Sequence, residues 1–273
     1  MFCTVGASDA TVTTIGAGRA TNRLATARSS RQFVTRALTA GTYPAYYARM
    51  RNLNQIGAPL LVRPPDLDID SLQNWLAQGA LLVDIRTAEA FRSAHIPGSI
   101  ATGADGNISG WVGRLVGPER PLVLVADEGS RGAGQIQEAV SQLVRIGCDR
   151  IVGYLGGGLH TWRSAGHKVV GYDTLNAAEL TQRLDADELL PVIDVREAAE
   201  WHLGHIPGSV SLPLCDIWTH ESVVPRQSPV AVHCGYDYRG TLGASLLEQV
   251  GYSQLSVVID GWEGWSALEE VPR

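Results

Sequence analysis

Two hydrophobic patterns alternate along residues 66–260. Helical spacing of apolar residues alternates with short, continuous apolar runs that are typical of strands buried on both faces. Regular alternation of strands and helices predicts parallel sheets covered by helices on both faces, which is an α/β fold. The expected strands span 80–83, 121–125, 151–154, 191–196, 230–232 and 255–259, and the helical patterns span 72–76, 136–146, 175–184 and 241–250.

Polar residues indicate where some of these helices begin. Asp70 or Ser71 can cap the first helix, and Gly79 follows its last apolar residue. Thr174 can cap the corresponding helix later in the chain. Short polar side chains at such positions accept hydrogen bonds from backbone N–H groups of the first turn.

The first 62 residues show little regular patterning and predict an irregular N-terminal extension. A short helix is expected over 30–38, and the aromatic-rich stretch 43–54 is expected to pack against another part of the chain. Pro64 and Pro65 then predict a boundary. Arginine, serine and threonine are frequent in the first 40 residues, which leaves an organelle transit peptide as an alternative interpretation.

A long motif occurs twice. Asp84-Ile85-Arg86, followed by His95-Ile96-Pro97-Gly98-Ser99, recurs 110 residues later as Asp194-Val195-Arg196 and His205-Ile206-Pro207-Gly208-Ser209. The later strands and helices repeat in the same order, and Gly158…Trp162 corresponds to Gly261…Trp265. This internal repeat predicts two similar α/β units, in which the motif residues are expected to be architectural.

Composition narrows the range of functions. The 273 residues suggest two domains, and 45% apolar with 18% charged residues is typical of a packed core. A net charge of −6 argues against nucleic-acid binding, and no apolar run is long enough to indicate a membrane span. The four cysteines and seven histidines form no ligand cluster, so neither a metal nor a disulfide framework is expected. These features favour a reducing cytoplasm.

Cys234 is the strongest candidate nucleophile. It follows the apolar run 230–232, and a loop from Cys234 to Arg239 leads into the predicted helix 241–250. A strand, a tight loop and a helix expose a side chain at the carboxyl edge of a parallel sheet. The loop amides and the helix N-terminus are expected to lower the thiol pKa. A buried cysteine at a strand end is the alternative for this stretch.

Both repeats resemble the rhodanese (sulfurtransferase) domain through the Asp-x-Arg and His-Ile-Pro-Gly-Ser motifs. The resemblance implies two domains over 63–171 and 172–273, each with a parallel sheet of about five strands and no cofactor. It implies that Cys234 becomes a persulfide by taking sulfane sulfur from thiosulfate or a persulfide, and passes the sulfur to a thiophilic acceptor. It also implies that the loop holds the small-molecule donor through Gly235, Tyr236, Asp237, Tyr238, Arg239 and Gly240.

The active loop departs from the pattern of that family. Asp237 stands where many members have glycine, and Tyr236 and Tyr238 replace small or basic residues. The charge of Asp237 is expected to oppose a thiolate and an anionic donor, which puts thiosulfate in doubt. In the first repeat, Asp127 is expected to correspond to Cys234, so that copy should be inactive and the second should be active alone.

Other interpretations of the chain remain open. The two domains could form a non-catalytic module that binds or scaffolds a partner in sulfur metabolism. A phosphatase is less favoured, because the short loop from Cys234 to Arg239 encloses a ring of amides better suited to sulfur than to phosphate. Within residues 1–62, the stretches Thr14-Ile15-Gly16, Thr21-Asn22, Phe33-Val34 and 44–54 resemble the tail of a metallo-β-lactamase-fold domain in persulfide-dioxygenase-like fusions. This resemblance suggests a separate protein of that fold as a partner.

Overall fold

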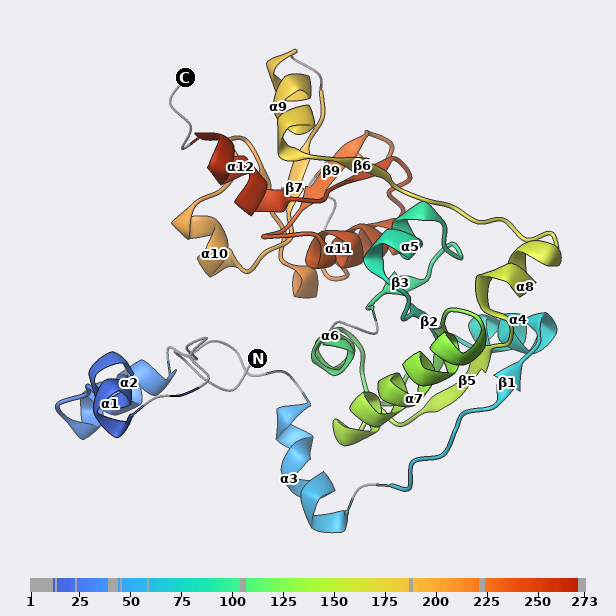
Figure 1. The fold of residues 1–273 in the computed structure, drawn as a ribbon, viewed down its shortest axis with the longest axis horizontal. Helices are drawn as coiled ribbons and strands as arrows, with labels where there is room; N and C mark the ends of the chain where they lie inside the picture. Colours follow the sequence, from blue (N-terminus) through green and yellow to red (C-terminus); the bar gives the residue numbers. More distant parts are fainter. Residues whose placement is uncertain are drawn as a thin grey trace.

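The computed structural model describes residues 12, 14–22, 24–38, 44, 46–57, 59–103, 107–186, 189–220 and 224–269. They form two five-stranded parallel sheets flanked by helices, which confirms the predicted α/β fold. Figure 1 shows the two sheets as separate layers of one molecule. Residues 1–11, on which part of the predicted N-terminal extension falls, lie outside the described residues.

The first sheet has the strand order β1-β5-β4-β2-β3. Its strands are β1 (Asp66–Leu67), β2 (Leu81–Asp84), β3 (Ile100–Ala101), β4 (Leu122–Val125) and β5 (Ile151–Leu155). The helices of this repeat are α4 (Ile69–Ala77), α5 (Ala88–Ser93), α6 (Ile108–Leu115), α7 (Gly129–Arg145) and α8 (Gly158–Ser164).

The second sheet repeats this topology with the order β6-β10-β9-β7-β8. Its strands are β6 (Asp173–Leu175), β7 (Val192–Asp194), β8 (Val210–Ser211), β9 (Val230–His233) and β10 (Leu255–Val258). Its helices are α9 (Ala177–Asp185), α10 (Ala198–Leu203), the 3-10 helix η1 (Leu214–Asp216), α11 (Tyr238–Gln249) and α12 (Gly261–Glu269).

Alternating strand residues point into different cores. In β4, Leu122 and Leu124 belong to a core that continues into the second repeat, whereas Val123 packs under α4 and α8. In β9, Val232 belongs to the shared core, whereas Ala231 packs under α9 and α12. Because side chains alternate across a strand, each sheet contributes one face to a common interior and covers the other with its own helices.

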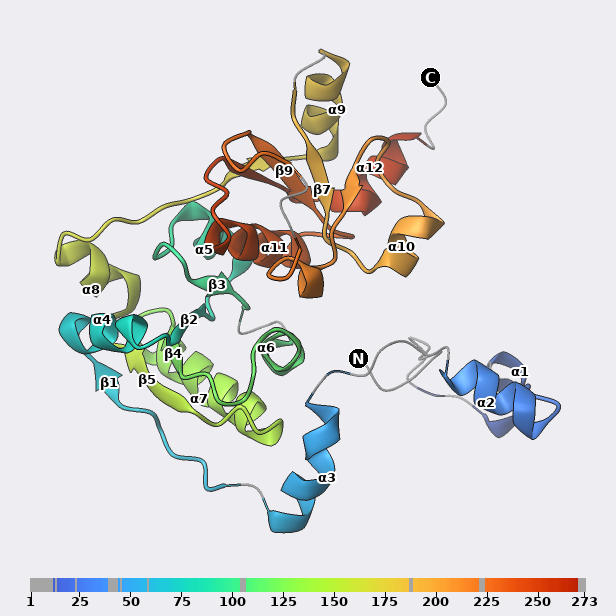
Figure 2. The same ribbon diagram turned by 180° about the vertical axis from the view of Figure 1, so that it is seen from behind.

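Helix α11 lies in this common interior. Every residue from Gly240 to Leu247 is buried, so the helix has no exposed stripe over that length. A helix that is buried all round must be covered on several sides. Sheet residues of its own repeat cover one side, and β3 and α5 of the first repeat cover another, as Figures 1 and 2 both show.

The repeated motif residues bind backbone and each other. Asp84 is held by Arg86, whose Nη2 also donates to Ala94 O at 2.8 Å. Arg196 binds Asp194 in the same way and donates to Gly204 O at 2.7 Å. These buried pairs fix the turn that follows β2 and β7, which is the architectural role expected from the sequence.

Among the described residues, three helices precede the first sheet, namely α1 (Ile15–Thr21), α2 (Ser30–Leu38) and α3 (Tyr47–Ile56). The short helix predicted over 30–38 is confirmed, and it lies with α1 apart from both sheets in Figures 1 and 2. Tyr46 and Met50 pack into the shared core, as the aromatic stretch predicted.

Two predicted helix caps are wrong. Asp68, rather than Asp70 or Ser71, caps α4, and its side chain accepts from Ser71 N at 2.8 Å. Asn176 rather than Thr174 caps α9, because Thr174 lies in the edge strand β6. None of the described helices combines the length and apolar character that a membrane crossing requires.

Candidate active site

Cys234 lies immediately after β9, at the carboxyl edge of the second sheet, as the sequence predicted. The helix that follows begins at Tyr238, three residues before the predicted start, so the loop between strand and helix is short. The thiol is 0% exposed. The loop therefore encloses the sulfur rather than presenting it to solvent.

The pKa of Cys234 results from opposing effects. Burial is the largest and raises the pKa of the thiol. The Arg239 guanidinium and the backbone N–H groups of Gly240, Tyr236 and Arg239 act in the opposite direction. The net result is a raised pKa, which is contrary to the lowering expected from the sequence. The amide ring expected around the sulfur is present, but burial outweighs it.

Backbone hydrogen bonds from the end of the sheet hold the loop. Trp262 N donates to Cys234 O at 2.8 Å, Glu263 N donates to Gly235 O at 3.1 Å, and Asp237 N donates to Ile259 O at 2.9 Å. Gly261 has a φ of +51°, and a Cβ there would collide with Cys234 O. The segment that follows β10 can thus approach the loop only because a glycine stands at this position.

Arg239 has a carboxylate partner. Its Nη1 and Nη2 lie 2.6 Å and 2.8 Å from the two carboxylate oxygens of Glu200 on α10. This hydrogen bonding raises the pKa of Arg239. The same contact lowers the pKa of Glu200, although burial of that carboxyl acts against it. Glu200 therefore competes with any anionic donor for the guanidinium.

Asp237 has an unusual backbone conformation. With a φ of +40° it is the one non-glycine residue with positive φ in the described part of the chain. Such conformations cost on the order of 1–3 kcal/mol and persist when surrounding contacts hold them. Its Oδ1 accepts a hydrogen bond from Arg92 Nη1, and Arg92 belongs to α5 of the first repeat.

The expected effect of Asp237 on the thiol is not supported. Its carboxylate is paired with Arg92, and Asp237 is not among the groups that chiefly shift the pKa of Cys234. Because Arg92 compensates the negative charge of Asp237, that charge no longer argues against an anionic donor.

The two loop tyrosines differ in their contacts. Tyr238 donates its hydroxyl hydrogen to Thr102 O of the first repeat, and its ring lies against Gly103. The Tyr236 side chain is 64% exposed. Gly235 and Gly240 bring the backbone close to Arg239 and Val257. The predicted loop residues are thus together in space, with Tyr236 at the solvent side.

Buried polar groups lie behind Cys234. His233 Nδ1 is 3.1 Å from Cys234 O. Its Nε2 is 3.5 Å from Asp194 Oδ2 and has no hydrogen-bond partner among the residues that the structure describes. Burial is the main cause that lowers the pKa of His233, so the ring is neutral near pH 7. Sequence reasoning did not single out His233, Glu200 or Arg92, and only the His-Cys pair gave a local signal.

The first repeat has alanine at the position that corresponds to Cys234. Asp84 pairs with Val125 and Asp194 pairs with His233, so the next residue, Ala126, corresponds to Cys234. The expected correspondence of Asp127 is wrong by one residue, because the count assigned the wrong strand residues to each other. A Cβ on Gly158 would collide with Ala126 O, just as one on Gly261 would with Cys234 O.

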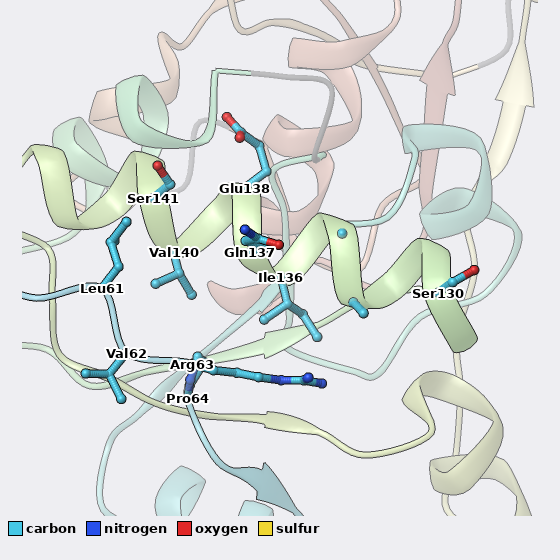
Figure 3. Close-up of a pocket in the computed structure, with 12 residues that line it drawn as sticks. Leu61, Val62, Arg63, Pro64, Ser130, Ile136, Gln137, Glu138, Val140 and Ser141 are labelled. Carbon is cyan, nitrogen blue, oxygen red and sulfur yellow. The ribbon is translucent and has the colours of Figure 1, made fainter.

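A separate cavity of about 830 Å³ lies in the first repeat. Figure 3 shows Ile136 and Val140 of α7 facing the extended segment that contains Leu61 and Val62. None of the predicted site residues lines it.

The rhodanese-like domain model matches residues 68–165 and 176–268. The chain belongs to the rhodanese-like domain family. Both repeats are matched, in agreement with the duplicated sheet topology.

Two relatives named for sulfur carriage or transfer match this chain over about the length of one repeat. A sulfurtransferase of Allochromatium vinosum is 28% identical over 92 residues, which is 34% of this chain and 86% of that protein. A Bacillus subtilis protein named "Putative sulfur carrier protein YrkF" is 28% identical over 89 residues, 33% of this chain. The match spans about half of that relative, 48% of its length.

Solved structures also resemble the chain. The thiosulfate sulfurtransferase of Pseudomonas aeruginosa has a TM-score of 0.33 and 21% identity, covering 74% of this chain and 42% of that one. A rhodanese-related protein of Thermoplasma volcanium has a TM-score of 0.32 and 29% identity, covering 37% of this chain and 96% of that one.

Proposed function

We propose that this protein is a sulfurtransferase that carries sulfane sulfur on Cys234. The observation that supports it is the ring of donors around the sulfur, made of the amides of Tyr236, Arg239 and Gly240 together with the Arg239 guanidinium. Donors fixed in this way stabilise negative charge on a thiolate and on the terminal sulfur of a persulfide. The remaining loop residues, Gly235, Asp237 and Tyr238, shape the donor site.

Two displacement steps complete the reaction. The Cys234 thiolate attacks the outer sulfur of thiosulfate, a Cys–S–S⁻ persulfide forms, and the S–S bond of the donor breaks to release sulfite. A thiophilic acceptor such as cyanide then attacks the terminal sulfur. Thiocyanate leaves and the Cys234 thiolate is regenerated, so atoms and charge balance without an oxidant. A persulfide donor would react similarly and release its thiol.

A non-catalytic role is the second candidate. Cys234 is fully buried, its pKa is raised by burial, and Arg239 is already paired with Glu200. These features favour a module that binds a protein partner of sulfur metabolism. The candidate partner is a metallo-β-lactamase-fold protein, which is suggested by residues 1–62. Both roles are proposed for the cytoplasm.

Mass spectrometry distinguishes these two roles. The full chain is incubated separately with thiosulfate and with glutathione persulfide, and the Cys234 peptide is examined for the mass of one added sulfur atom. We expect the added mass on Cys234, and its removal by cyanide with release of thiocyanate. Cys215→Ser, which removes an exposed thiol, is the matched control for Cys234→Ser. Absence of sulfur on Cys234 with both donors would favour the non-catalytic role.

A further inference from the structure

The first repeat contributes a buried cation to the active loop. Arg92 is only 8% exposed, and its Nη1 donates to Asp237 Oδ1 and, at 2.7 Å, to Thr241 Oγ1. Asp237 and Thr241 flank the first turn of α11, directly after the loop that encloses Cys234. The guanidinium therefore bridges the loop and the helix from the other repeat.

The conformation of Asp237 requires such support. An L side chain disfavours a φ of +40°, whereas glycine adopts positive φ without penalty. Tyr236, whose amide acts on the Cys234 sulfur, immediately precedes Asp237. A change of backbone conformation at Asp237 would therefore move a donor of the sulfur ring.

This inference rests on the proposed function: we infer that Arg92 is a positioning residue that holds Asp237 in its positive-φ conformation and so keeps the amide ring on the Cys234 sulfur. The first repeat, which has Ala126 where the second has Cys234, thus helps to form the site. Arg92 does not touch the sulfur in this arrangement. It acts through the Asp237 carboxylate, and a glycine at position 237 would make the clamp unnecessary.

The reactivity of Cys234 towards iodoacetamide gives a test that needs no turnover. The alkylation rate is measured against pH by peptide mapping, and its midpoint reports the apparent pKa of Cys234. The other charged or titratable groups around the loop are unchanged in every variant compared, namely Arg239, Glu200, His233, Asp194, Asp260 and Glu263.

We expect Arg92→Gln to shift the midpoint to higher pH by on the order of one unit, because the thiolate loses an aligned amide. Arg131→Gln is the matched control, since it breaks an Arg–Asp pair in the loop of the first repeat. In the Asp237→Gly background, Arg92→Gln should cause no further shift. An unshifted Arg92→Gln midpoint, or an undiminished shift in the Asp237→Gly background, would overturn the inference.

A second comparison leaves the buried arginine in place, in case Arg92→Gln fails to fold. Asp237→Ala removes the carboxylate but retains a Cβ, so it should show the alkaline shift. Asp237→Gly should keep the wild-type midpoint, because glycine needs no clamp. Equal midpoints for these variants would overturn the inference. Sulfur loading of wild-type Cys234 is measured in parallel. A wild type that takes up no sulfur would contradict the proposed function, whatever the alkylation midpoints are.

Discussion

His95 Nε2 lies 3.0 Å from Glu248 Oε2, and this contact joins the repeated motif of the first half to helix α11 of the second. Glu248 also accepts from Gly98 N and from the Tyr172 hydroxyl, each at 2.8 Å. The corresponding His205 has its Nδ1 3.0 Å from Trp201 O, as His95 has with Phe91 O at 2.9 Å. The first copy of the motif thus holds the two repeats together, in addition to making the local hydrogen bond that both copies share.

Glu248→Gln should weaken this docking. Hydrogen bonds from His95, the Gly98 amide and Tyr172 lower the pKa of Glu248, although burial is the largest single effect and acts to raise it. A carboxyl whose pKa is lowered by folding stabilises the protein above its unfolded pKa of about 4.3, and the stabilisation is lost as pH falls through the folded value. We expect a loss of about 1–3 kcal/mol at pH 7.

Denaturant titrations of Glu248→Gln and wild type at pH 7 and at successively lower pH measure this effect. The difference in unfolding free energy should shrink as the pH falls below about 4, where the wild-type carboxyl becomes protonated. Glu138→Gln is the control, because Glu138 lies on the exposed face of α7 and binds only Gln142 among the described side-chain contacts. A difference that does not depend on pH would contradict the role given to the carboxylate.

The sequence was sufficient for the fold and for the position of Cys234 at the end of a strand. Short β-branched runs are intrinsically suited to buried parallel strands, and the duplicated motif made two equal units the simplest arrangement. The position of Cys234 followed from strand, loop and helix alone. Each of these inferences depends on residues close together in the chain.

The residues that tune the site could not be found in this way. Arg92 and Asp237 are 145 residues apart, and Arg239 and Glu200 are 39 apart. Only the docking of the repeats and the placement of α10 bring them together. The error at Asp127 has another cause, since counting matched Val125 with Val232, whereas the hydrogen-bond register matches Val125 with His233 and so identifies Ala126.

Glu200→Gln should make Arg239 available to an anionic donor. The substitution removes the carboxylate that now binds both guanidinium nitrogens. We expect a several-fold lower KM for thiosulfate and a lower apparent pKa of Cys234, because Glu200 no longer compensates the positive charge of Arg239. Steady-state thiocyanate formation measures the first effect and alkylation the second. Glu197→Gln, at the other acidic residue of the α10 N-terminus, serves as control. An unchanged or higher KM would show that Arg239 does not contact the donor.

The isolated segment 172–273 should fail to keep the activity of the full chain, contrary to the expectation that the second copy acts alone. Separation would remove the groups that cover α11, including the contact of Ala101 N with Ser245 Oγ at 3.1 Å and the Arg92 clamp on Asp237. Size-exclusion chromatography, circular dichroism and sulfur loading of the fragment test this. Addition of segment 63–171 should restore loading. A folded fragment that loads sulfur as fast as the full chain would show that the first repeat is dispensable.

Ala126→Cys, made together with Cys234→Ser, should not transfer the activity to the first repeat. Ala126 occupies the matching strand end and is 4% exposed, so a thiol there would be buried as Cys234 is. The surrounding backbone differs, however, because α7 begins at Gly129 and leaves a shorter loop. The Asp127 amide in that loop already donates to Gln135 Oε1 at 2.9 Å and is not free for a sulfur.

We therefore expect no added sulfur on the Ala126→Cys peptide after incubation with thiosulfate or glutathione persulfide. The substitution adds one sulfur atom to a packed site and should cost at most about 1–3 kcal/mol of stability. Cys234→Ser alone and wild type give the two reference states for the mass measurement. Sulfur on the new cysteine would show that a buried thiol at the end of a parallel strand is sufficient. The donor ring of Tyr236, Arg239 and Gly240 would then not be what makes the second repeat competent.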